Sequence, residues 1–116
     1  MADSLNVSGV IPLGEVTAAA GVKAAITANR TVPTAGYKVH GVILIAREGN
    51  TGRVDVYRSN RDGGYDRIGY VPIPTTTTAP SFSIAMTAAA AAIQINDLYI
   101  APVVNGDGVI VTALVA

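Results

Sequence analysis

Arg53-Val54-Asp55-Val56-Tyr57-Arg58 is the stretch that decides the fold, because its polar and apolar side chains alternate with a period of two. Successive side chains of an extended strand point to opposite faces of a sheet, so Val54 and Val56 face one way, and polar residues alternate with them or flank them. Three other tracts alternate in the same way, and Gly, Pro, Asn or Asp bounds each of them. The pattern predicts β-strands that are half buried.

The other apolar segments are short, and turn-forming residues separate them about every 8–14 residues. The further strands that we expect are 5–11 (ended by Pro12), 16–28, 37–46, 68–73, 81–86, 93–101 and 109–115. Segment 16–28 also fits an amphipathic helix, but Gly21 and the period-two order favour a strand. The centre of 37–46, Val42-Ile43-Leu44-Ile45, is apolar on both faces, which predicts a strand in the middle of a sheet sandwich.

Turn signals define the expected connections. Glu48-Gly49-Asn50-Thr51-Gly52 is expected to join 37–46 to 53–58 as a β-hairpin. Asn105-Gly106-Asp107-Gly108 predicts a tight turn before the last strand. The alanine run 88–92 fits either a short helix or a loop packed on the sheet.

About eight short strands with this spacing predict an all-β fold, either an antiparallel β-sandwich or a jelly-roll-like barrel. Residues 1–116 are expected to form a single β-sandwich domain, because a chain of this length buries roughly two-thirds of its unfolded surface. The sequence has no long helical segment for βαβ crossovers, which argues against a nucleotide-binding α/β fold.

The amino-acid composition limits which partners and which cellular compartment the protein is expected to have. The chain has eight Lys and Arg and eight Asp and Glu, so its net charge does not favour nucleic acid or an anionic membrane. This low charge favours association with copies of itself or with a scaffold. The absence of cysteine excludes disulfides and thiol chemistry, and no apolar run approaches the ~20 residues of a membrane helix. The start Met1-Ala2-Asp3-Ser4 does not resemble a signal peptide, so we expect synthesis in a host cytoplasm.

The sequence contains no motif for catalysis or cofactor binding. His40 is the only histidine, so a histidine-cluster metal site is excluded, and we interpret His40 as an ordinary strand residue. The Asn105-Gly106-Asp107-Gly108 tetrad resembles part of a calcium loop but lacks the closing Glu, and turn formation explains it. Gly63-Gly64 lacks the lysine or helix of a phosphate loop. We therefore expect no cofactor, no small-molecule substrate and no enzymatic activity.

Residues 47–67 hold more than half of the charged residues, and arginine outnumbers the acids there by five to four. Arginine is favoured at protein interfaces, because its planar guanidinium pairs with two acceptors at once. One interpretation is a docking face for a partner or a neighbouring subunit. The other is a solvated hairpin with local ion pairs, each worth about 0–1 kcal/mol. The interface candidates are Arg47, Arg53, Arg58, Arg61, Arg67 and Tyr65.

Two stretches resemble hairpins of small tailed-phage virion proteins. Val42-Ile43-Leu44-Ile45-Ala46 followed by Gly49-Asn50-Thr51-Gly52-Arg53-Val54-Asp55-Val56 resembles the apolar strand, Asn-Thr-Gly turn and Val-x-Val strand of that family. Asp97-Leu98-Tyr99-Ile100-Ala101 with Gly106-Asp107-Gly108-Val109-Ile110-Val111 resembles its closing hairpin, although Ala101-Pro102 stands where the family has an acidic residue. The resemblance implies a small β-sandwich on a phage head or fibre, similar to capsid decoration (cement) proteins that act as symmetric oligomers.

The first functional hypothesis is a structural virion protein that decorates the capsid or is otherwise attached to the head. Its expected partners are copies of itself (a homo-oligomer) and a major capsid or other virion protein, contacted through loop 58–67 or the threonine-rich linker 74–80. Its expected location is the virion. The alternative is a carbohydrate- or cell-surface-binding module, for which Tyr65 beside Gly63-Gly64 is the best stacking residue.

Overall fold

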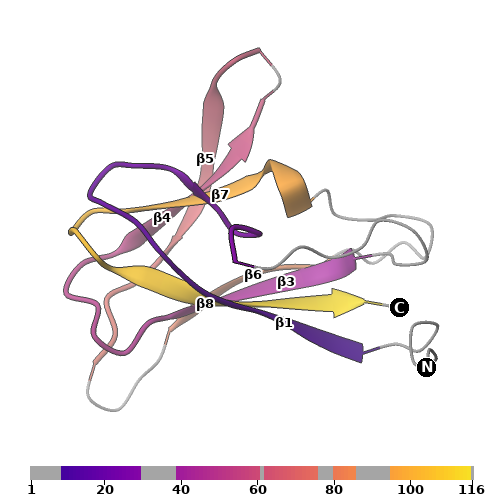
Figure 1. Ribbon diagram of the computed structural model, residues 1–116, viewed down its shortest axis with the longest axis horizontal. Coiled ribbons are helices and arrows are strands. Elements are labelled where there is room, and N and C mark those ends of the chain that lie inside the picture. Colours follow the sequence, from indigo (N-terminus) through magenta and orange to yellow (C-terminus); the bar gives the residue numbers. More distant parts are fainter. Residues whose placement is uncertain (1–8, 30–38, 61, 76–79, 86–94, 116) are drawn as a thin grey trace.

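The computed structural model describes residues 9–29, 39–60, 62–75, 80–85 and 95–115, which form two four-stranded antiparallel sheets packed face to face (Figure 1). Sheet A has the order β1-β8-β3-β6, and sheet B has the order β2-β7-β4-β5. The strands of sheet A are β1 (Gly9–Thr17), β8 (Gly108–Val115), β3 (Val39–Ala46) and β6 (Ser81–Ala85). The strands of sheet B are β2 (Ala24–Ala25), β7 (Leu98–Pro102), β4 (Val54–Ser59) and β5 (Tyr65–Val71). A short 3₁₀ helix, η2 (Ile95–Asp97), leads into β7.

The strand order is that of a jelly roll. Antiparallel pairs join β1 with β8, β2 with β7, β3 with β6 and β4 with β5, as in one long hairpin that has been rolled up. Among these eight strands, β4 and β5 are the only consecutive pair in one sheet, and the other connections cross from sheet to sheet. This arrangement is a double-sheet jelly roll. It confirms the antiparallel all-β sandwich that the strand spacing predicts.

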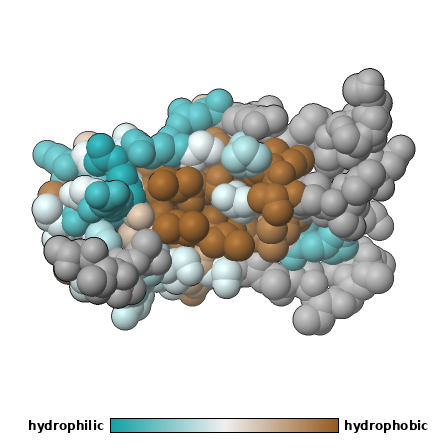
Figure 2. Space-filling view, turned by 90° about the horizontal axis from the view of Figure 1, so that it is seen from below, coloured by the Kyte–Doolittle hydropathy of each residue, from teal (hydrophilic) through white to brown (hydrophobic). Residues whose placement is uncertain are grey.

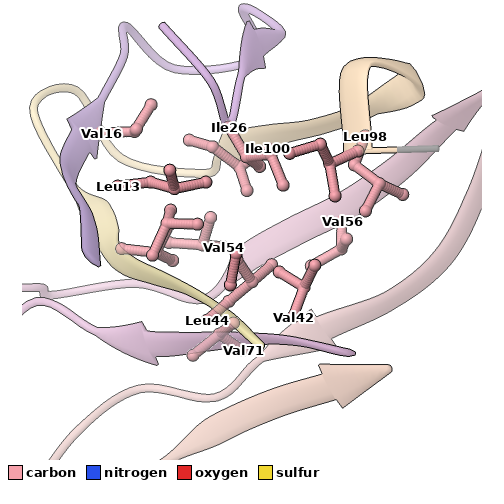
Figure 3. Packing of buried hydrophobic residues seen from close by; sticks show 14 of the residues in the cluster. Leu13, Val16, Ile26, Val42, Leu44, Val54, Val56, Val71, Leu98 and Ile100 are labelled. Atoms are coloured by element: carbon pink, nitrogen blue, oxygen red, sulfur yellow. The ribbon is translucent and has the colours of Figure 1, made fainter. Parts of the chain in front are cut away.

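Aliphatic side chains from the facing sides of the two sheets form the core (Figure 3). Val54 and Val56 are fully buried, as their alternation with polar residues predicts. They pack in one cluster with Leu44 of sheet A and Ile100 of β7. Because each buried Val, Leu or Ile contributes about 1.5–3 kcal/mol, this aliphatic layer holds the two sheets together.

Proline at position 12 does not end the first strand, contrary to the prediction. β1 pairs with β8 on both sides of Pro12, and the register shifts between Pro12 and Gly14, which marks a β-bulge. β1 is an edge strand. Edge strands and bulges tolerate proline, because a backbone N–H at such a position is not needed for a hydrogen bond to a neighbouring strand. Residues Leu13 and Val16, beyond the proline, are buried in the core.

The single strand predicted over residues 16–28 is also wrong. β1 ends at Thr17, the chain turns at Gly21, whose φ is +74°, and only Ala24–Ala25 pair with β7. Glycine adopts a positive φ without the steric cost that other residues meet. The apolar residues that alternate in this segment are largely alanines, which fit a turn as well as a strand. The pattern therefore did not indicate where the chain crosses from one sheet to the other.

The hairpin predicted over residues 37–58 does not form, and neither does the closing hairpin implied by the resemblance. β3 and β4 lie in opposite sheets, and so do β7 and β8. The turns at 48–52 and 105–108 therefore connect strands across the sandwich. The local hairpin is instead β4–β5, and β5 begins at Tyr65, three residues before the predicted start. The alanine run 88–92 and residues 76–79 of the threonine-rich linker lie outside the described residues.

Buried polar groups fasten the two crossing loops to each other at one end of the sandwich. The Asp107 carboxylate accepts hydrogen bonds from the backbone N–H groups of Thr51 and Gly52, at 3.0 and 2.9 Å. The Asn50 amide donates to the carbonyl oxygen of Gly108 at 2.7 Å and accepts from its N–H at 2.9 Å. Asn50 and Asp107 are both buried. The 105–108 tetrad is thus a turn, and the carboxylate of Asp107 holds the facing loop.

Phe82 of β6 lies between the sheets and packs against Gly69 of β5. Gly69 has no side chain, and a Cβ atom at this position would overlap the Phe82 ring. The single phenylalanine of the chain therefore fills a space that a glycine on the other sheet leaves open.

We expect Gly69→Ala to lower the free energy of unfolding by about 1–3 kcal/mol, because the new methyl group forces the Phe82 ring to shift. Thermal denaturation at fixed protein concentration, followed by circular dichroism, measures the change. Adding Phe82→Leu to Gly69→Ala should recover part of the loss, since the smaller side chain leaves room for the methyl group. A melting temperature that Gly69→Ala leaves unchanged would contradict this packing.

Candidate functional site

The outer face of sheet A carries apolar side chains in three rows that cross the strands. Val42 and Leu44 face the core, so Ile43 and Ile45 of the same strand face outward. The register places these outward residues beside others: Val10 pairs with Leu114, Pro12 and Ile43 both pair with Thr112, and Ile45 pairs with Ile110. We call the set Val10, Pro12, Ile43, Ile45, Ile110 and Leu114 the apolar face.

Much of the apolar face is open to solvent. Val10 is 64% exposed and Ile110 is 42% exposed, while Ile43, Ile45 and Leu114 are half-buried. Figure 2 looks at this side of the molecule, from below the view of Figure 1, and shows a continuous hydrophobic area in its middle. Contiguous apolar surface of this kind on a folded domain marks a site of interaction with another molecule.

The border of the apolar face is polar and nearly uncharged. Ser81 and Ser83 of β6 pair with Ile45 and Ile43 and continue the rows outward. Glu15 pairs with Ile110 at one corner, and its carboxylate accepts a hydrogen bond from Arg47 Nε at 3.1 Å. The sequence predicted that the run Val42-Ile43-Leu44-Ile45, apolar on both faces, lies in the middle of a sheet sandwich, and β3 is an interior strand of sheet A. Within the described chain, only the inner face is covered.

Four tyrosines lie on the outer face of sheet B, on the opposite side of the molecule. Tyr57 alternates with the buried Val54 and Val56 and therefore points outward. Tyr99 of β7 pairs directly with Tyr57, while Tyr65 and Tyr70 occupy outward positions of the edge strand β5. The residues Tyr57, Tyr65, Tyr70 and Tyr99 make up what we call the tyrosine face.

Cations lie against the rings of the tyrosine face. Lys23, in the loop before β2, places its Nζ 4.6 Å from the ring centre of Tyr57 and 5.0 Å from that of Tyr65. The Arg67 guanidinium lies 5.5 Å from the ring centre of Tyr70. A cation over an aromatic ring is attracted by the electrons of the ring face, worth about 0.5–1 kcal/mol at an exposed site. Sequence reasoning missed Lys23, because nothing local connects it with residues more than thirty positions away.

The tyrosine face also contains a shared ion pair. Asp55 Oδ1 lies 2.9 Å from Arg53 Nε and 3.1 Å from Arg67 Nη2, so one carboxylate serves two guanidinium groups. The two arginines cover Asp55, which is only 8% exposed although its position faces outward. At the far end of the same hairpin, Arg58 pairs with Asp66 at 3.6 Å.

The structure therefore brings some of the interface candidates together and separates others. Arg53, Arg67 and Tyr65 share the outer face of sheet B, with Arg58 at its end. Arg47 lies apart, next to Glu15 at the corner of the apolar face. Arg61 lies outside the described residues. The four described arginines all make ion pairs within the chain, and a docking role for the candidates remains a prediction.

In the described part of the chain, the side chains that could act in catalysis or metal binding do not lie together in one site. His40 lies at the bulge of β3, where the register shifts between Val39 and Gly41. Among the described residues, no three His, Cys, Asp or Glu side chains come together to hold a metal ion. The described helical segments include none that is long and apolar enough to cross a membrane.

Comparison of the chain with protein-family models, with curated proteins and with solved structures found no match. The two outer faces of the sandwich are therefore the features from which a function can be inferred.

Proposed function

We propose that this protein is a structural subunit that assembles with copies of itself through the apolar face of sheet A. The observation that carries the proposal is the outer face of sheet A, whose described side chains are mostly apolar and which no other described segment covers. In an isologous dimer the same patch meets itself, so it must be complementary to itself. Among the described residues of this face, Glu15 is the charged one, and because it is paired with Arg47 a second copy can approach without like charges facing one another.

The size of the apolar face suits the centre of a subunit interface. From Ile110 to Leu114 it extends about 14 Å along β8, and the spacing of β1, β8 and β3 adds about 10 Å across. A stable interface buries about 800 Å² per partner, with an apolar centre and a polar rim. The apolar face supplies the centre, and Ser81, Ser83 and the Glu15–Arg47 pair supply part of the rim.

Within this class, we propose a capsid decoration protein or another head-associated virion protein, with a major capsid or other virion protein as the second partner. Jelly rolls occur in viral capsids as well as in lectins, so the fold alone does not decide between them. Three features favour the virion: the exposed apolar face, the zero net charge and the resemblance to tailed-phage virion proteins. Mass spectrometry of particles purified from cells that carry the gene in its natural context tests the location.

We expect the full chain to form a defined oligomer at micromolar concentration, and Ile110→Lys to raise its dissociation constant by about tenfold or more, because the variant buries an unpaired charge in the interface. Sedimentation equilibrium measures both. Val22→Lys, the same type of change at an exposed loop residue, is the control and should leave the oligomer intact. A chain that stays monomeric at tens of micromolar, or an Ile110→Lys variant that assembles like the original, would exclude the apolar face as the interface.

A further inference from the structure

We propose that the tyrosine face of sheet B binds an oligosaccharide that carries a carboxylate, lying along the edge strand β5 from Tyr65 to Tyr70. This binding site is separate from the apolar face, which lies on the opposite sheet. The proposal therefore holds whether or not the chain assembles through sheet A.

The tyrosine rings supply a stacking surface for sugar. Tyr65 and Tyr70 are 43% and 49% exposed, so ring surface is available to a ligand. The Tyr65 ring meets the Tyr99 ring edge to face, with ring centres 5.1 Å apart and planes at 80°, which fixes its orientation. A ring held in place by its neighbours loses little conformational entropy when a ligand stacks on it.

Charge on this face selects an acidic ligand. The Lys23 ammonium lies against the ring of Tyr57. Arg53 and Arg67 both pair with one carboxylate, that of Asp55. These described groups therefore leave an excess of positive charge beside the rings. The described contacts of the Lys23 ammonium are the two rings, so a ligand carboxylate can pair with it without displacing a described salt bridge.

The shape of the face suits an extended ligand. Tyr65 and Tyr70 are five residues apart on β5, which corresponds to about 15 Å along the strand, the length of a short oligosaccharide. Arg67 lies between them, beside the Tyr70 ring. Sugar rings stacked at Tyr65 and at Tyr70 would therefore place their hydroxyl and carboxylate groups near Arg67 in the middle and near Lys23 at one end.

The experiment compares acidic and neutral glycans as monovalent probes in solution. Isothermal titration with 3′-sialyllactose and with trigalacturonate, against lactose as the neutral probe, measures affinity per site without the gain that several linked sites would give. We expect at least one acidic probe to bind, and to bind about tenfold or more tightly than lactose. Lys23→Gln and Tyr70→Ala should each weaken that binding at least severalfold.

Three controls keep the result interpretable. Lys23→Arg retains the cation and should retain binding, while Ser83→Ala on the other sheet should have no effect. Circular dichroism verifies that each variant is folded. No binding of either acidic probe, equal binding of lactose, or binding that Lys23→Gln and Tyr70→Ala leave unchanged would overturn the proposal. Equally tight binding of a poly-glutamate peptide, lost in the same variants, would overturn it in favour of an acidic protein partner.

Discussion

Gly108→Ala should lower the free energy of unfolding by about 3 kcal/mol or more, one of the two largest effects that we expect of a single substitution in this chain. A Cβ atom at position 108 would overlap the backbone carbonyl oxygen of Val16 and press against Thr17. The obstacle is backbone of the neighbouring strand, which, unlike a flexible side chain, has no alternative rotamer. β1 and β8 would have to separate where their pairing begins.

The same substitution also disturbs the hydrogen bonds at this point. The carbonyl oxygen of Gly108 accepts from both the Arg47 N–H, at 3.1 Å, and the Asn50 amide, at 2.7 Å. A shift of the strand that relieves the overlap with Val16 would stretch these hydrogen bonds, and buried donors left without a partner cost about 1–3 kcal/mol each.

Gly49→Ala is the matched control, because its new Cβ would have only the end of the Arg47 side chain within ordinary contact distance. Urea denaturation of both variants, at one fixed concentration because assembly itself stabilises the folded chain, measures the difference. Gly49→Ala should stay within about 0.5 kcal/mol of the original chain. If Gly108→Ala lowered the free energy of unfolding as little as Gly49→Ala does, β1 and β8 could not approach each other as closely as the structure shows. If Gly108→Ala does not fold at all, the expected effect is reached.

Most of the strands were predictable from the sequence, although 16–28 is not a single strand. The pairing of the strands was not predictable. The alternation around Val54 and Val56 reflects one buried and one solvated face, and that pattern is local. Of the two strands beside β4, β5 follows it directly in the chain, whereas β7 comes much later, so the pairing of β4 with β7 depends on residues far along the chain. Turn residues at 48–52 and 105–108 identify a change of direction, but they do not say whether the next strand returns in the same sheet or crosses to the other.

The two candidate surfaces differ in how far they could be predicted from the sequence. The apolar run Val42-Ile43-Leu44-Ile45 was a clear signal of an interior strand, and β3 is one. The signal did not show that its outer side chains, Ile43 and Ile45, stay half-buried on the outside of the sandwich. Of the tyrosine face, the sequence singled out Tyr65 as a stacking candidate, but no run of residues indicated the face as a whole. Lys23, Tyr57 and Tyr99 come from three separate segments, and only the pairing of β7 with β4 and the approach of the β2 loop bring them together.

Asp107→Ala should lower the free energy of unfolding by about 2–4 kcal/mol. Its Oδ2 accepts from the N–H groups of Thr51 and Gly52, and Asp107 is only 4% exposed, so water does not readily replace it. Alanine leaves the two donors without an acceptor. Because the loop that carries Thr51 and Gly52 connects β3 to β4, the loss weakens the crossing between the two sheets.

Asp107→Asn separates the role of shape from the role of charge. Asparagine keeps a carbonyl oxygen where the carboxylate oxygen was, so one acceptor remains for Thr51 and Gly52, but hydrogen bonds to an uncharged acceptor are weaker. We therefore expect Asp107→Asn to lose about half as much stability as Asp107→Ala in urea denaturation at fixed protein concentration. An Asp107→Ala variant within about 0.5 kcal/mol of the original chain would mean that the two crossing loops are held by packing alone. A loss in Asp107→Asn as large as in Asp107→Ala would mean that the negative charge, rather than the position of an acceptor, holds the loop.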